Sequence, residues 1–99
     1  MKPIVFAPDA GAEFEAVVDW YEVKAAGLGE RFVHYVDDAL QLIAETPAGC
    51  PEWETDPRFR RAVVQRFPYL VLYRDLDDRI EVVAVAHGAR EPGYWLKRK

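Results

Sequence analysis

The side chains of this 99-residue chain that could do chemistry gather from residue 60 onward. His87 and Tyr94 could transfer protons. Four arginines could offset negative charge on a phosphate: Arg60, Arg61, Arg66 and Arg90. Metal-free cleavage of RNA through its 2′-hydroxyl needs a proton acceptor, a proton donor and such positive charge. A histidine that ends an apolar strand is more often a structural hydrogen-bonding residue, so His87 has two interpretations.

Arg60 and Arg61 are neighbours in an expected strand, so their side chains point to opposite faces and only one can face a given partner. Either could form a surface ion pair of small value with an acid of the preceding loop, Glu52, Glu54 or Asp56. Either could instead clamp a phosphate or a carboxylate, for which the planar guanidinium is suited. Both interpretations stay open.

The last residues place aromatic side chains beside basic ones. Tyr94 and Trp95 precede Lys97, Arg98 and Lys99. The rings could form a strap that packs on the core while the cations stay in solvent, which we expect at least for Trp95. They could also contact a target, because tryptophan, tyrosine and arginine are enriched at binding hot spots. The two roles are compatible.

Other kinds of site are poorly supported. Cys50, His34 and His87 are too few and too scattered for a zinc site. Cys50 has no nucleophile signature around it, and the glycines form no phosphate-binding loop. We therefore expect neither a metal nor a cofactor. A single cysteine cannot form an internal disulfide, and no apolar run suits a signal peptide or a membrane span, so we expect a cytoplasmic protein.

Charge is segregated along the chain. Residues 1–56 carry three basic and twelve acidic side chains, whereas residues 57–99 carry ten basic and five acidic ones. The formal charges of the two parts are −9 and +5, which the net charge of −4 conceals. Such asymmetry suggests different partners for the two parts.

The elements that position these residues follow from apolar spacing. Residues 4–7 predict a short strand, and Asp9 is a plausible N-cap for the helix that follows. Four residues then form one helical face: Phe14, Val17, Val18 and Tyr21. Gly27 and Gly29 mark the exit from this helix and the start of a second one, which ends near residues 46–49. The short connection predicts antiparallel packing of the two helices.

The second half predicts strands. Residues 47–57 form a proline-rich loop to which we assign no regular structure. Strand-like runs follow at residues 62–64, 69–73 and 80–86, and the polar turn from Asp75 to Asp78 predicts a hairpin between the last two. Pro68 predicts a bend before the run at residues 69–73. The order β-α-α-β-β-β predicts an α+β fold, a twisted antiparallel sheet packed against an N-terminal α-helical hairpin, as a single domain over residues 1–99.

The chain resembles the RelE/ParE superfamily of type II toxin–antitoxin toxins over nearly its whole length. The features that carry the resemblance are Trp20-Tyr21, the following Gly-Leu-Gly, Phe32, the Pro47 loop, Arg60-Arg61, Arg66 to Tyr69, Tyr73, Val85 to His87, Arg90, Pro92 and Tyr94-Trp95. Their order and spacing together make the match. The resemblance implies a growth-inhibiting toxin encoded beside an antitoxin, which neutralises it and alone contacts operator DNA.

Known toxins of this fold have two activities. RelE-like members cleave messenger RNA in the ribosome, whereas ParE-like members, associated with plasmid stabilisation, inhibit DNA gyrase without that catalytic set. A ribosome-binding protein usually carries a large positive balance, so this net acidic chain favours the ParE-like branch. A ribosome-dependent endoribonuclease and a partner-binding relic without toxicity are the alternatives.

The resemblance also distributes the candidate residues among roles. In a nuclease, the catalytic candidates are those that could handle protons and the phosphate: His87, Tyr94, Arg61, Arg66 and Arg90. Contact with the target is expected from the basic and aromatic residues of the sheet and tail: Arg60, Arg61, Arg90, Tyr94, Trp95, Lys97 and Arg98. Contact with the antitoxin is expected from Trp20, Trp53 and Tyr73, the two tryptophans only if they are exposed rather than in the core.

Overall fold

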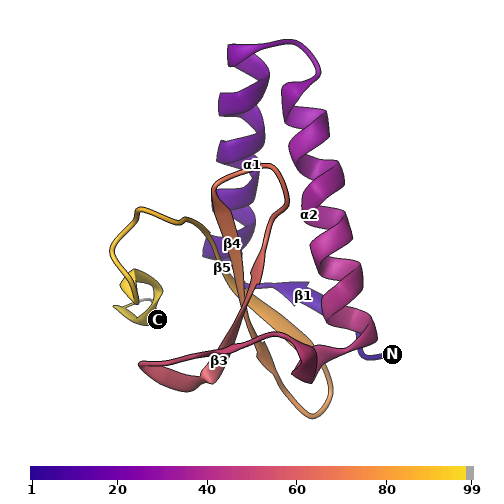
Figure 1. Ribbon diagram of the computed structural model, residues 1–99, viewed down its shortest axis with the longest axis vertical. Helices are drawn as coiled ribbons and strands as arrows, with labels where there is room; N and C mark the ends of the chain where they lie inside the picture. The colour runs from indigo at the N-terminus through magenta and orange to yellow at the C-terminus, as the bar shows by residue number, and fades with distance from the viewer. Residues whose placement is uncertain (98–99) are drawn as a thin grey trace.

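The computed structural model describes residues 1–97, in which a helical hairpin stands against one sheet (Figure 1). Within these residues the α-helices are α1 (Pro8–Lys24) and α2 (Leu28–Glu45). The strands are β1 (Ile4–Phe6), β2 (Glu52–Trp53), β3 (Asp56–Val63), β4 (Tyr69–Asp75) and β5 (Ile80–His87). Two short 3-10 helices complete the elements: η1 (Pro47–Gly49) and η2 (Tyr94–Lys97).

The start of α1 differs from the sequence prediction. Ala7 is the N-cap residue and Pro8 occupies the first turn, so Asp9 lies inside the helix and the prediction that it is the N-cap is wrong. Proline is favoured at the first helical position because its missing N–H has no helical acceptor there. Asp9 instead places a negative charge in the first turn, where it suits the helix dipole.

The turn between the helices lies where the glycines predict it. Gly27 has a φ of 86°, the left-handed conformation in which glycine has no steric cost. The Glu22 carboxylate of α1 accepts hydrogen bonds from the N–H groups of Gly27, at 2.9 Å, and Gly29, at 3.1 Å. These bonds satisfy donors that the start of α2 leaves without a helical partner.

The sheet has the strand order β1-β5-β4-β3-β2. β1 pairs parallel to β5, with Ile4 opposite Ile80, and the other neighbours pair antiparallel. The predicted α+β fold and its order of elements are confirmed, with a parallel pair added at one edge. The predicted hairpin joins β4 to β5, and the predicted bend before β4 contains Arg66 in a left-handed conformation with a φ of 66°.

The loop predicted at residues 47–57 holds regular structure after all. It contains η1, β2 and the start of β3. Two sheet side chains hold it, because the Tyr73 hydroxyl donates to the carbonyl oxygen of Pro47 at 2.6 Å and Arg60 donates to that of Cys50 at 2.6 Å. Elements this short leave no periodic pattern to recognise in a sequence.

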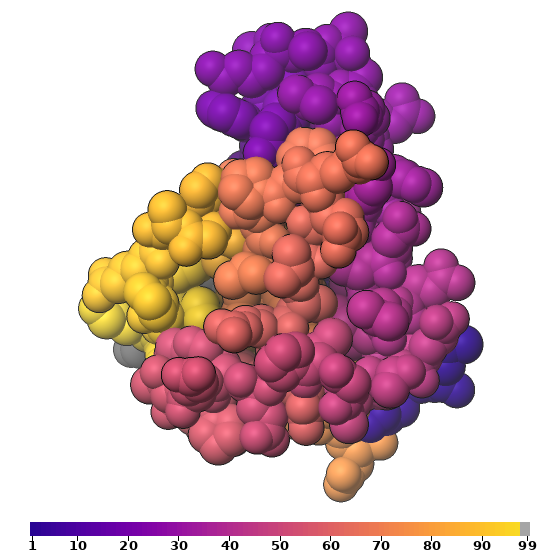
Figure 2. Space-filling model, in the orientation of Figure 1, coloured from indigo at the N-terminus to yellow at the C-terminus, as the bar shows by residue number. Residues whose placement is uncertain are grey.

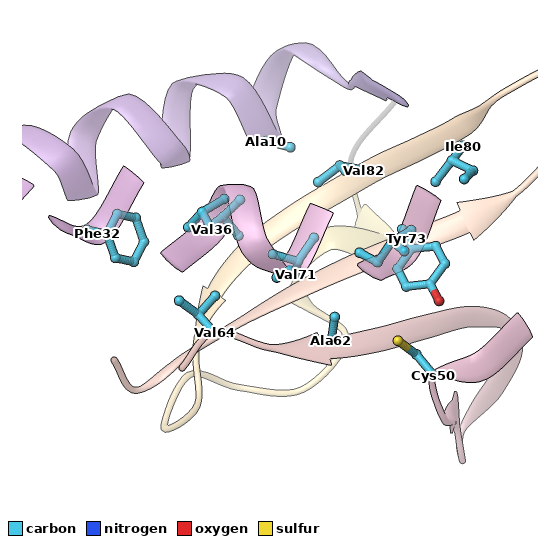
Figure 3. Packing of buried hydrophobic residues seen from close by; sticks show 13 residues of the cluster. Ala10, Phe32, Val36, Cys50, Ala62, Val64, Val71, Tyr73, Ile80 and Val82 are labelled. Carbon is cyan, nitrogen blue, oxygen red and sulfur yellow. The ribbon is translucent and has the colours of Figure 1, made fainter. Parts of the chain in front are cut away.

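One face of the sheet packs on the helices. Phe32 and Val36 of α2 lie over Val71, Tyr73 and other buried sheet residues, as Figure 3 shows. Alternate strand residues therefore form the core on this side.

The opposite face, here called the outer face, carries Phe59, Leu72, Ala84 and Ala86 and is covered by Trp95. Residues 88–97, here called the tail, bring Trp95 into place, and only 7% of that residue is exposed. Figure 2 shows the tail, in yellow, lying against the orange strands. The expectation that Trp95 packs as part of a strap is confirmed. None of the helices in residues 1–97 is both long and apolar enough to cross a membrane.

Candidate functional site

A cavity of about 160 Å³ lies between the outer face and the tail, and is here called the tail cavity. Its lining includes Arg61 from β3, His87 from the end of β5, and Arg90 and Tyr94 from the tail. Four of the five predicted nuclease candidates thus meet in one place. Arg66, in the turn before β4, is not among the lining residues.

Glu13 of α1 fixes the tail beside this cavity. One carboxylate oxygen accepts a hydrogen bond from the N–H of Val85 at 3.1 Å. The other accepts from the Tyr94 hydroxyl and lies 3.5 Å from Nη1 of Arg90. The Arg90 guanidinium also lies 3.7 Å from the centroid of the Tyr94 ring, a cation–π contact. Both predicted tail residues are therefore held by an acid from the helical hairpin.

Sequence reasoning missed Glu13. Its partners stand more than 70 residues further along the chain. Only the neighbouring apolar residue Phe14 hints that Glu13 lies near the core, and no local pattern identifies the partners.

His87 has one ring nitrogen already in use. Its Nδ1 accepts a hydrogen bond from the N–H of Ala89 at 3.0 Å, and its ring meets the Tyr69 ring edge-on at 5.2 Å. In the neutral imidazole, the other nitrogen then carries the proton and acts as a donor. His87 could act as a general base only by giving up the bond to Ala89, which favours the structural interpretation.

The neighbouring arginines divide as their alternation on the strand predicts. Arg60 turns to the loop, where it donates to the carbonyl of Cys50 and lies 3.4 Å from a carboxylate oxygen of Glu52. Arg61 lies exposed at the tail cavity. The Arg60 side chain thus holds the loop, whereas the exposed Arg61 side chain is the one that a partner can reach.

Asp56, a third predicted partner for these arginines, pairs instead with Arg58. Arg58 donates to both carboxylate oxygens, at 3.0 and 2.6 Å. The hydrogen bonds from the Arg58 side chain hold the pKa of the Asp56 carboxyl below its usual value.

The predicted antitoxin contacts lie in three different environments. Trp20 is 54% exposed and lines a groove of about 580 Å³, here called the apolar groove, together with Val17, Tyr21 and Tyr69. Trp53 is half-buried with its ring 5.0 Å from that of Trp95.

Tyr73 lies fully inside the core. Its burial leaves no surface for a partner, so its position does not support the antitoxin contact assigned to it. The Tyr73 hydroxyl serves the Pro47 loop instead.

The remaining residues expected to contact the target are Lys97 and Arg98. Lys97 is exposed at the end of η2, and Arg98 lies outside the described residues. Within residues 1–97, no three side chains among histidine, cysteine, aspartate and glutamate gather as a metal site would require.

Comparisons with known proteins bear on the whole chain. Residues 4–92 match the family model described as ParE toxin of type II toxin-antitoxin system, parDE. Among solved structures, the chain is similar to one described as chromosomal ParDE TA system from P. aeruginosa, with a TM-score of 0.74 and 18% sequence identity. The alignment covers 88% of this chain and 96% of that chain, and at this identity it shows the fold alone. A comparison with curated proteins finds no match.

Proposed function

Because the chain belongs to the ParE toxin family of type II toxin–antitoxin systems, we propose that it inhibits DNA gyrase and that a cognate antitoxin neutralises it. The observation that carries this proposal is the family match over residues 4–92. An inhibitor that works by binding needs no catalytic centre, cofactor or metal. The protein would act in the cytoplasm as one domain over residues 1–99, and would reach operator DNA only through its antitoxin.

The state of the nuclease candidates supports inhibition by binding. The accepting nitrogen of His87 is used by Ala89, and the Tyr94 hydroxyl donates to Glu13. Arg66 stands apart from the tail cavity. His87 could accept a proton only by giving up its bond to Ala89, and Tyr94 could transfer its proton only by giving up its bond to Glu13.

The surface proposed for gyrase lies around the tail. Arg61, Arg90 and Tyr94 would contact the target directly, with Lys97 beside them and Arg98 continuing the basic segment. Because Trp95 is buried, it would hold these residues in place rather than contact the target itself. Arg60 would serve the loop that it already binds.

The surface proposed for the antitoxin centres on Trp20. Its exposed indole and the apolar groove beside it would give a partner helix a place for its apolar face. An apolar groove of this kind on an isolated chain is a liability for solubility, which is a physical reason to expect a partner.

One observation favours a second candidate function, a ribosome-dependent messenger endoribonuclease. The tail cavity brings Arg61, His87, Arg90 and Tyr94 together, and these types could serve proton transfer and phosphate binding. A chain that keeps the fold but has lost toxicity is the third candidate.

Two assays on the purified protein separate these functions. We expect inhibited supercoiling and accumulated plasmid cleavage by gyrase, with messenger left intact on programmed ribosomes. Messenger cleavage with unaffected gyrase would replace the proposal by the nuclease, and inactivity in both assays would indicate the relic.

Replacement of His87 gives an independent check. We expect His87→Gln to keep its effect on gyrase, whereas a nuclease that uses His87 would lose about 10²–10⁴-fold in rate. His34→Gln is the matched control, because His34 is exposed on α2, outside the tail cavity.

A further inference from the structure

The tail cavity has the charge of a site for an anion. Arg61, His87 and Arg90 line it, with Glu91 as the acid among the lining residues. Arg61 is exposed, and its side chain forms no ion pair with any other residue in the part of the chain that the structure describes. A guanidinium in this setting can offer two parallel N–H groups to an incoming anionic group.

Trp95, which lines the tail cavity and also a pocket beside Arg58 and Arg74, supplies a second observation. The Nε1 of its indole is buried and meets no hydrogen-bond acceptor within residues 1–97. Leaving a buried N–H donor unsatisfied costs free energy, and such donors are uncommon in folded proteins. Trp95 lines the tail cavity, so an oxygen that reached Nε1 from this side would satisfy the donor.

The size of the cavity limits what can enter. Its volume of about 160 Å³ is below the range of roughly 300–1,000 Å³ typical of small-molecule sites. Leu70, Leu72 and Ala86 give it an apolar floor that suits methylene groups. A short side chain that ends in a carboxylate fits both this floor and the cations above it.

The cavity adjoins the apolar groove. His87 lines both of them, so the two sites share a wall. The groove offers Trp20, Tyr21 and Tyr69 to apolar side chains. A partner segment lying in the groove would therefore bring a neighbouring side chain to the cavity.

We propose that the tail cavity binds a glutamate or aspartate side chain of the antitoxin, at one end of a segment whose apolar side chains fill the apolar groove. The inference rests on the proposed function for the identity of the partner. The bound carboxylate would cover Arg61 and Arg90, two residues assigned above to contact with the target. Antitoxin and target would then exclude each other at this site, which explains neutralisation by direct occlusion.

Nuclear magnetic resonance on the purified chain tests the site with a residue-sized probe. The probe is N-acetyl-glutamate N-methylamide, and its neutral twin is the corresponding glutamine derivative. We expect the indole N–H resonance of Trp95 to shift with saturation at a Kd of about 1 mM, the ordinary affinity for a ligand of this size. The glutamine twin should bind at least about tenfold more weakly, because it lacks the charge that Arg61 recognises.

Variants locate the effect. We expect Arg61→Gln to remove the preference for glutamate over glutamine. Arg31→Gln, which changes an exposed arginine on α2, should keep it.

Three results would overturn the proposal: equal responses to the two probes, no saturable shift of the Trp95 resonance, or a tighter Arg61-dependent response to inorganic phosphate. The last result would assign the cavity to nucleic-acid phosphate. Because the experiment contains no gyrase, its failure would leave gyrase inhibition standing.

Discussion

Glu13 joins three parts of the molecule with one carboxylate. It accepts hydrogen bonds from the backbone of β5 and from the Tyr94 hydroxyl, and it lies beside Arg90. β1 pairs with residues 80–82 alone, so the outer edge of β5 extends beyond it and needs other acceptors there. Glu13 therefore closes a sheet edge and anchors the tail at once.

Replacing Glu13 by glutamine should loosen the tail without unfolding the domain. The amide keeps one acceptor oxygen but loses the charge that holds Arg90, and we expect a loss of about 1–2 kcal/mol. Native-state hydrogen exchange should show faster exchange at residues 88–97 than in the natural protein. Glu15→Gln, on an exposed position of the same helix, is the control. Unchanged tail exchange in Glu13→Gln would contradict this role.

The buried Tyr73 hydroxyl makes the free energy of unfolding depend on pH in alkaline solution. Burial raises the pKa of the Tyr73 hydroxyl well above its ordinary value, and burial also raises the pKa values of Tyr21 and Tyr69. Above about pH 10 the unfolded chain loses these protons while the folded chain keeps them, so the free energy of unfolding falls as pH rises. Below pH 10 both states are neutral and this contribution is complete.

The Tyr73→Phe variant separates the two effects of this hydroxyl. At neutral pH we expect a loss of about 1–2 kcal/mol, because the Pro47 carbonyl loses its donor. Above pH 10 the fall in stability with pH should be shallower, since the variant lacks one of the tyrosines whose pKa burial raises. Urea titrations at a series of pH values measure both, and an unchanged slope would refute the assignment.

At the level of elements, α1 and α2 approach closely at Gly29. A Cβ atom built on Gly29 would lie 2.6 Å from the carbonyl oxygen of Val18, a backbone atom that cannot turn aside. Gly29→Ala should therefore push the helices apart and destabilise the fold by about 1–3 kcal/mol. Gly11→Ala is the matched control, because a Cβ there meets Phe6 at an ordinary 4.0 Å.

We expect Gly11→Ala to stabilise the fold, not only to leave it intact. Alanine in a helix interior is favoured over glycine by about 0.5–1 kcal/mol. Relative to the natural protein, the melting temperature should fall for Gly29→Ala and rise for Gly11→Ala. The expected change is about 4–8 °C per kcal/mol for a domain of this size. Equal melting temperatures would show that the helices can separate without cost.

Local pattern predicts these elements better than it predicts their pairing. The apolar spacing of the helices, the glycines between them and the polar turn before β5 each act within a few residues, and each was read correctly. The parallel pairing of β1 with β5 joins residues more than 70 positions apart, so no local pattern contains it. β2 was missed because its two residues are too few to show a periodic pattern.

The candidate site follows the same division. Arg61, His87, Arg90 and Tyr94 were identified from their residue types, and the fold places all four at the tail cavity. Glu13 was not identified, because its importance arises only when α1 lies beside the tail. The burial of Tyr73 also depends on the fold, since an aromatic strand residue can face either the core or a partner.

At the scale of the whole molecule, the resemblance to the RelE/ParE superfamily is confirmed by the family match and by the shared fold. The separation of charge along the chain becomes a separation in space. The acidic part, residues 1–56, includes the helical hairpin, and the described residues from 57 onward form most of the sheet and the tail, as the residue colours of Figure 1 allow the reader to follow. The apolar groove and the tail cavity meet at His87, between these two regions.

This arrangement predicts a salt-dependent complex with the antitoxin. If charge complementarity contributes to binding, the affinity should fall as salt rises from about 0.05 to 0.5 M, because screening lengths shorten to a few ångströms. Arg61→Gln should flatten this dependence, since it removes one of the cations proposed to meet the partner. Trp20→Ser should weaken binding by about 1–3 kcal/mol at every salt concentration while leaving the dependence unchanged, because its contribution is apolar. An affinity that does not change with salt would show that the groove alone holds the partner, and the segregated charges would then need another explanation.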